Sequence, residues 1–301
     1  LAVAHGSNIS ASLFGALAAS GALPFARSAF ESTIRESGKG VGPSLQAFSA
    51  GFDATLGLTD KDTAPQSAKL AVAGRNNFMP QWEILRRRID ALPDPVRPMA
   101  LAGLEKVVDF QDCSYGSLYL DRVEQMMAQD SASHDWLLAI TAAKYIANAM
   151  AYDDIIRVAD LKTRGSRFDR IRTEMAACPD QVMQLTEYFH PRAEEISGML
   201  PRSLGARVES SPRIMAWLNR RFAAGRRLRT DSIPAFLLLY WLGGLRSYRL
   251  KTRRHSIEVA HLDAWLHQSL APLASNYELS VEMLRCQRLI KGYSDTHSRG
   301  Q

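Results

Sequence analysis

The side chains best suited to binding chemistry lie near the end of the chain, on a helix predicted over residues 275–291. Ser275 and Glu278 have the spacing of a capping box at its start, and Cys286 falls on its apolar face with Leu279, Met283 and Ile290. The cations on its other side are Arg285, Arg288 and Lys291. Because arginine presents a planar fork of donors to phosphate and carboxylate groups, this side could bind an anion. The alternative is a Cys286 that faces the core, with basic neighbours in solvent, and we expect this arrangement.

Two histidines could take part in acid–base chemistry. In the tail, Asp295 could pair with His297 and orient its imidazole beside Tyr293. His190 precedes Pro191, so it is expected in extended backbone at a helix break, where its ring could enter a cleft. An unpaired tail histidine and a packed loop histidine are the alternatives. The candidate cleft residues are therefore His190, Tyr293, Asp295 and His297.

Alternating charges follow one face of a helix predicted within residues 152–164. Asp153 and Arg157, and Asp160 and Arg164, are four residues apart, while Arg157 and Asp160 are three apart. Exposed pairs of this kind each stabilise a helix by only about 0.2–0.5 kcal/mol. The ladder is either an ordinary surface feature or a device that presents cations to an anion. The candidate anion-binding residues here are Lys162, Arg164 and Arg167.

A strongly basic segment lies between Arg213 and Arg254. It contains eleven Lys and Arg residues and one acid, Asp231, within a chain of net charge +6. Such a segment attracts phosphates, acidic proteins or nucleic acid, although a solvated helix face is an equal alternative. The candidate contact residues are Arg226, Arg227 and Arg229.

Aromatic residues interleave the basic segment, as the stacking platforms of a nucleic-acid-binding module would. They are Trp217, Phe222, Tyr240, Trp241 and Tyr248. Most of them fall on apolar stripes, so we expect them in the core and expect a protein partner rather than nucleic acid. The alternative function remains a helical module that binds nucleic acid or an acidic protein through residues 213–254.

Several kinds of site are missing from the sequence. The three cysteines are far apart, which argues against a disulfide framework and for a reducing, cytoplasmic compartment. No C-x-x-C, H-E-x-x-H, G-x-S-x-G, P-loop or G-x-G-x-x-G pattern occurs, so no metal or cofactor site is expected in this chain. The longest apolar run, residues 233–245, is too short to span a bilayer, and we expect a buried helix and no membrane contact.

The hydrophobic pattern predicts an all-α protein. Residues 7–52 contain two or three short helices that are too few to bury their own apolar faces. Residues 53–77 have no sustained period and predict a linker, while residues 78–301 predict a multi-helix domain. Its stripes include Trp82 to Ile89, and Trp136 to Met150 continuing to Leu161. No strand alternation is evident, and since the chain begins with Leu1 rather than Met, we expect sequence before it.

Three parts of the chain resemble one family, in collinear order. Near the start, SLFGALAASGALP at 12–24 and IRESGKGV at 34–41 are similar to the end of the γ-type domain of 2-oxoacid:ferredoxin oxidoreductases. YDDIIRVADLKTR at 152–164 resembles a run in the helical extension that follows this domain in the indolepyruvate:ferredoxin oxidoreductase β-subunit family. RLIKGYSDTH at 288–297 resembles the closing segment of that extension.

The resemblance implies a component of an enzyme that oxidatively decarboxylates arylpyruvates, with ferredoxin as electron acceptor and coenzyme A as acyl acceptor. It implies that residues 1–52 are the C-terminal part of an α/β γ-type domain. In that family thiamine diphosphate attacks the keto carbon and iron–sulfur clusters carry electrons. This chain lacks the G-D-G motif and clustered cysteines, so both cofactors are expected on a partner subunit. We expect the chain alone to be inactive and to dock on that partner, with the basic segment contacting ferredoxin or coenzyme A.

Overall fold

The computed structural model describes residues 9–37, 40–57, 78–175, 183–189, 191–222 and 226–290. These residues are mostly helical, with one two-stranded sheet, which confirms the predicted all-α, multi-helix class. The chain forms two compact units. The first contains α1 to α3 and α9 (Gly165–Glu174), and the second contains the other described elements. The predicted linker at 53–77 falls largely outside the described residues, so its limits stay predictions.

The first unit has a small core. Its helices α1 (Ile9–Ala19), α2 (Arg27–Glu36) and α3 (Val41–Thr55) bury Phe30, Ile34 and Phe48. Glycine lets α1 and α3 touch, because a Cβ on Gly15 would lie 2.0 Å from the Phe48 carbonyl oxygen. Several large apolar side chains stay exposed, among them Leu13, Phe25 and Leu56. These helices thus leave apolar surface uncovered, as their small number led us to expect.

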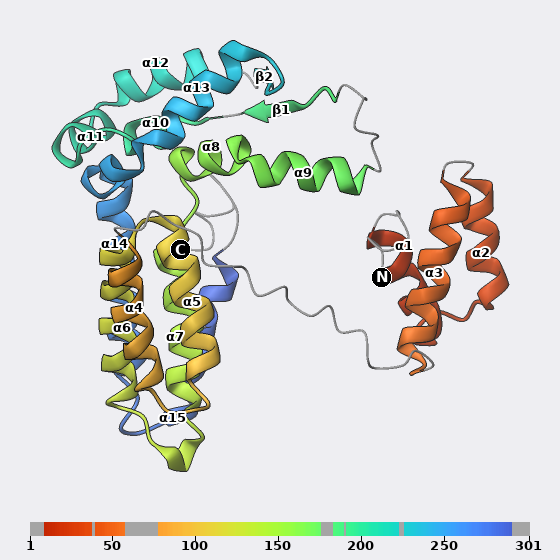
Figure 1. The fold of residues 1–301 in the computed structure, drawn as a ribbon, viewed down its shortest axis with the longest axis horizontal. Helices are drawn as coiled ribbons and strands as arrows, with labels where there is room; N and C mark the ends of the chain where they lie inside the picture. Colours follow the sequence, from red (N-terminus) through yellow and green to blue (C-terminus); the bar gives the residue numbers. More distant parts are fainter. Residues whose placement is uncertain are drawn as a thin grey trace. The chain divides into compact units, whose positions relative to one another are not determined.

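A helical bundle forms the core of the second unit (Figure 1). Its long helices are α4 (Met79–Asp90), α5 (Arg97–Phe110), α6 (Cys113–Met127), α7 (Leu137–Met150), α14 (Arg253–Leu270) and α15 (Tyr277–Arg285). Most residues of α7 are buried, because it packs against α5, α6, α14 and α15. Each fully buried Leu or Ile side chain here contributes about 1.5–3 kcal/mol. The predicted stripes at 82–89 and 136–150 are both helices of this bundle.

Shorter elements form a layer above the bundle (Figure 1). They are α8 (Ile155–Thr163), α10 (Ala193–Gly198), α11 (Arg202–Glu209), α12 (Pro212–Phe222), α13 (Ile233–Gly244) and the 3₁₀ segment η3 (Leu245–Lys251). Strand β1 (Thr186–Phe189) pairs antiparallel with β2 (Arg226–Arg229), with Thr186 opposite Arg229. We predicted no strand. Four residues are too few to establish alternation, and the two strands lie about forty positions apart in the sequence.

Three arginines satisfy the carbonyl groups at the end of α5, where a helix has no partners of its own. Arg246 donates to the carbonyl oxygens of Val108 (2.7 Å) and Asp109 (2.8 Å). The Asp109 carbonyl also accepts from Arg157 (3.2 Å), and the Phe110 carbonyl accepts from Arg249 (2.6 Å). We name Arg157, Arg246 and Arg249 the arginine cap. Because cations are favourable at a helix C-terminus, this cap fixes α8 and η3 to the bundle.

Our prediction for the last helix was wrong in its details. Asn276, not Ser275, caps α15, since its side-chain oxygen accepts from the amide of Leu279 (2.9 Å). The buried face carries Val281 and Leu284, so Cys286 is exposed and does not face the core. The mismatch begins within α15, where Leu279 of the predicted apolar face is 46% exposed while Val281 and Leu284 are buried. Gln287 continues this buried face into a 3₁₀ turn, η4 (Cys286–Leu289).

Candidate docking surface

Helix α13 lies on α8 through one narrow face. Leu239 is 2% exposed and Ala235 9%, and they are four residues apart, as one helix face requires. Near the end of the helix, a Cβ on Gly243 would lie 3.0 Å from the backbone nitrogen and Cα of Asp160 in α8. Glycine at this position therefore allows the two helix backbones to meet.

The opposite face of α13 is apolar and is not covered by the described residues of the second unit. Ile233 is 75% exposed, Leu237 56%, Tyr240 65% and Trp241 62%. None of the twelve residues of α13 is charged. We call these four side chains the outer face of α13. A surface helix ordinarily turns polar residues to water, so this face has the composition of a helix covered on both sides.

Two sequence expectations about these residues were wrong. Residues 233–245 were expected to form a buried helix, but only one face of α13 is covered within the described residues. Tyr240, Trp241 and Trp217 were expected in the core, yet more than half of each side chain is exposed. Phe222 and Tyr248 are partly buried. An apolar stripe in a sequence identifies a face to be covered, but not the chain that covers it.

The β1–β2 sheet brings predicted contact residues to the surface. The Arg227 guanidinium lies 5.4 Å from the ring centre of Tyr188, which is 73% exposed. Arg229 pairs with Asp231 at 2.6 Å, and this hydrogen bond raises the pKa of Arg229 and lowers the pKa of Asp231. The side chain of Arg226 lies outside the described ones. Arg227 and Arg229, two residues apart on one strand, point to the same side of the β1–β2 sheet.

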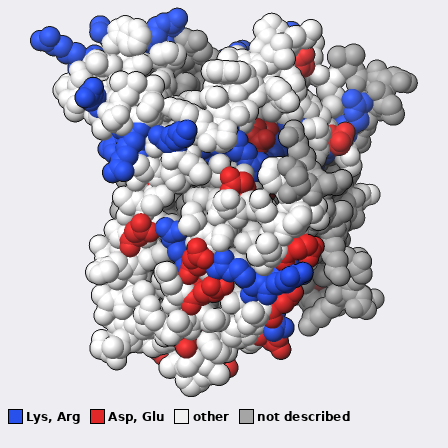
Figure 2. Space-filling model, turned by 60° about the vertical axis from the view of Figure 1, so that its left-hand side comes forward, with Lys and Arg blue, Asp and Glu red and all other residues white. Residues whose placement is uncertain are grey.

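Much of the charge of the basic segment is paired within the unit. Arg249 bonds Asp154 at 2.8 Å, Arg253 bonds Glu209 at 2.9 Å and Arg254 bonds Glu258 at 2.7 Å. The exposed members include Arg213, Arg220, Arg227 and Lys251. Figure 2 shows mostly basic side chains over the upper layer, and both signs interspersed over the bundle below. On the face shown, the excess of positive charge thus lies over the layer that carries α13.

The predicted charge ladder is present in part and reaches further than predicted. Asp160 pairs with Arg164 at 2.5 Å and with Arg157 at 3.4 Å. Both arginines also bond the carboxylate of Asp109 in α5, at 2.6 Å for Arg157 and 3.0 Å for Arg164. Burial alone would raise the pKa of Asp109, but hydrogen bonding and attraction from Arg157 and Arg164 outweigh it and lower the pKa. Sequence spacing gave no signal for Asp109, which lies about fifty residues away.

The other nominated cations occupy separate places. Lys162 pairs with Glu187 of β1 and lies 5.4 Å from the Phe189 ring, so this cation and Arg164 already have carboxylate partners. Arg167, in the first unit, lies 6.0 Å from the Phe168 ring.

At the end of the chain, Arg285 pairs with Glu282 at 2.5 Å and Arg288 is exposed. The predicted Lys291, Tyr293, Asp295, His297 and His190 lie outside the described residues.

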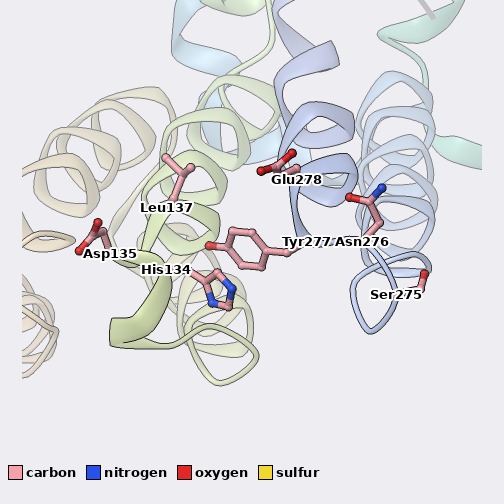
Figure 3. A pocket seen from close by; sticks show the side chains of 7 residues that line it. All are labelled: His134, Asp135, Leu137, Ser275, Asn276, Tyr277 and Glu278. Atoms are coloured by element: carbon pink, nitrogen blue, oxygen red, sulfur yellow. The ribbon is translucent and has the colours of Figure 1, made fainter.

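A surface hollow of about 500 Å³ lies at the far end of the bundle (Figure 3). The ring of His134 stacks on that of Tyr277 with centres 4.0 Å apart. Asp135 and Glu278 bring negative charge to the hollow, whereas the first turns of α7 and α15, which also line it, favour anions. These opposed preferences define no ligand class, so we do not take the hollow as the functional site.

The described ranges contain neither a cluster of metal ligands nor a membrane-spanning helix. No three His, Cys, Asp or Glu side chains gather there as a metal site would require. No helix in those ranges combines the length and the apolar character needed to cross a bilayer.

Comparison with known proteins gives one match. A family model described as a family of unknown function (DUF6537) matches residues 96–301. Searches of curated proteins and of solved structures gave no match. The matched range contains α13, the β1–β2 sheet and the arginine cap. Because the match covers more than half of the sequence, the chain belongs to this family of unknown function, DUF6537.

Proposed function

We propose that this chain is a helical part of an arylpyruvate:ferredoxin oxidoreductase subunit whose work is docking. The thiamine diphosphate and the iron–sulfur clusters belong to the partner polypeptide, and coenzyme A is a substrate of the assembled cytoplasmic enzyme. The collinear resemblance of 12–24, 34–41, 152–164 and 288–297 to the indolepyruvate-oxidising family supports the enzyme class. This chain then supplies protein contacts and no reacting group.

The observation that carries the docking role is the basic surface of the β1–β2 sheet. Arg227 is exposed and lies against the exposed ring of Tyr188, which limits the freedom of the guanidinium. Arg229 extends the same side of the strand. Positive charge displayed in this way accelerates encounter with an acidic protein, and the effect weakens with salt. Ferredoxin is the partner that we propose for it.

A ferredoxin titration against the enzyme assembled with its cofactor-bearing subunit tests this proposal. The variant Arg226→Glu/Arg227→Glu/Arg229→Glu should lower the association rate at least about tenfold and flatten its salt dependence. Arg87→Glu, an exposed arginine on α4, is the control and should change neither quantity. Equal ferredoxin affinity in the triple variant and the wild type rejects this role. Weaker binding of coenzyme A alone would instead assign the arginines to its phosphates.

One observation favours a second candidate function, nucleic-acid binding. Trp217, Tyr240 and Trp241 are exposed in the basic segment, where arginines and stacking rings could hold single-stranded nucleic acid. A gel-shift experiment with random RNA and DNA separates the two candidates. Tight binding at physiological salt, lost in Trp241→Ala, would favour nucleic acid, and binding only at low salt would reflect net charge alone.

A further inference from the structure

We propose that Tyr152 and His255 form a proton-sensitive contact that holds the upper layer on the bundle. It lies wholly within the second unit and does not depend on the enzyme class proposed above. Two connections join the layer to the bundle: residues 151–154 lead from α7 to α8, and Thr252 leads from η3 to α14. Tyr152 lies on the first connection and His255 follows the second, and the Tyr152 hydroxyl lies 3.1 Å from Nδ1 of His255.

Neighbouring polar contacts fix both residues at this junction. Arg249 of η3 bonds the carboxylate of Asp154, at the end of the first connection, at 2.8 Å. The Thr252 hydroxyl donates to the Arg249 carbonyl (2.7 Å) and accepts from the amide of His255 (3.2 Å). Of these contacts, the one at His255 can gain a charge between pH 5 and 8, since imidazole titrates in that range.

The surroundings of His255 disfavour a charged ring. The groups that face it are Arg249 of η3, Asp154 before α8, Arg122 and Tyr115 of α6, Tyr152 after α7 and Glu258 of its own helix. The two carboxylates are already engaged, Asp154 by Arg249 and Glu258 by Arg254 at 2.7 Å. Burial, followed by the charge of Arg249, lowers the pKa of His255, so its ring is neutral at pH 7.

Protonation changes the Tyr152–His255 contact in two ways. A neutral imidazole can accept the Tyr152 hydrogen at Nδ1, whereas both nitrogens of an imidazolium carry hydrogen and can only donate. The new positive charge also repels Arg249, which holds Asp154 at the start of α8. Acidification therefore loosens α8 and η3 while the bundle stays folded, and it frees the layer that carries the basic surface of the β1–β2 sheet.

The test is hydrogen–deuterium exchange of the intact chain at several pH values, corrected for intrinsic exchange rates. Between about pH 7 and pH 5 the protection of the α8 and η3 amides should fall at least about threefold, and it should stay below that of α7 throughout. His255→Gln, whose side chain does not titrate, should abolish most of this fall. The matched control is His134→Gln, an exposed histidine at the far end of the bundle, which should respond as the wild type does.

A second variant and a second measurement complete the test. Tyr152→Phe removes the hydroxyl and keeps the ring, so it should lower the protection of α8 and η3 at pH 7 by about threefold or more. An NMR titration of the wild type covers the case in which a variant misfolds, because the His255 ring and the amides of α8 and η3 should titrate together.

Two results would overturn the proposal. An unchanged pH dependence in His255→Gln, or a His255 ring that titrates without any change in the α8 and η3 amides, removes His255 from the junction's response. Equal protection of α7, α8 and η3 at every pH would show that the unit opens only by global unfolding, so that the layer has no separate release.

Discussion

Arg249 illustrates how a single side chain can depend on several partners. It is 1% exposed, and its guanidinium lies 4.0 Å from the Phe110 ring centre. It donates to the Asp154 carboxylate, the Phe110 carbonyl and the side chain of Gln111. A buried charge is tolerated only when it is paired and hydrogen-bonded, as this one is. Asp154 also caps α8 by accepting from the amide of Arg157. The pair therefore stabilises the start of α8 through Asp154 and the end of α5 through Arg249.

Replacing Arg249 by Ala should destabilise the second unit by about 3–5 kcal/mol, because Asp154 and the Phe110 carbonyl would lose a buried donor. Urea-induced unfolding followed by circular dichroism measures this loss. Arg285→Ala, which breaks an exposed pair with Glu282, should cost no more than about 1 kcal/mol. Similar losses in the two variants would contradict the assigned role of Arg249.

His255 predicts a pH dependence. Burial, followed by the nearby Arg249 charge, lowers the pKa of His255, and the Tyr152 hydroxyl lies 3.1 Å from its Nδ1. The unfolded chain takes up a proton near pH 6.5, whereas the folded site resists it until a lower pH. Stability should therefore fall as pH decreases below about 6.5. Unfolding free energies between pH 5 and 8 should show a smaller acid loss in His255→Gln, and parallel curves would exclude His255 as a cause.

At the scale of elements, sequence patterns predicted the helices better than the strands and the contacts between residues distant in sequence. The stripes of α4 and α7 were evident because each repeats over several turns and is buried as the pattern predicts. Strands β1 and β2 escaped notice because each has four residues and its partner is distant. Arg227 was predicted as a contact residue from charge alone, but Tyr188 beside it and Asp109 beside Arg157 required tertiary structure. The exposure of Trp241 could likewise be seen only in the tertiary structure.

The contact between α13 and α8 depends on the lack of a side chain at Gly243. Gly243→Val should destabilise the unit by about 1–3 kcal/mol, because its Cβ would lie 3.0 Å from the Asp160 backbone, which cannot yield as a flexible side chain would. Gly244→Ala is the control, since its Cβ would meet nothing within 4 Å. Thermal unfolding compares the two. An equal melting temperature for both variants would show that the close approach is not required.

At the scale of the molecule, the two compact units differ in what they leave uncovered. The first has a core of three large side chains and exposes Leu13, Phe25 and Leu56. The second buries an extensive bundle and exposes Ile233, Leu237, Tyr240 and Trp241 on one face of α13. The all-α class followed from periodicity, whereas the exposure of the outer face of α13 did not, since a buried apolar face and an exposed one share one sequence pattern.

The arginine cap has a consequence for any attempt to shorten this protein to its bundle. Arg157, Arg246 and Arg249 all lie in the upper layer, yet the carbonyl groups that they satisfy belong to α5. A bundle from which α8 and η3 were deleted would leave the Val108, Asp109 and Phe110 carbonyls without their arginine donors and uncover the Phe110 ring. A shortened protein that keeps only the bundle must therefore carry substitutes for these arginine donors.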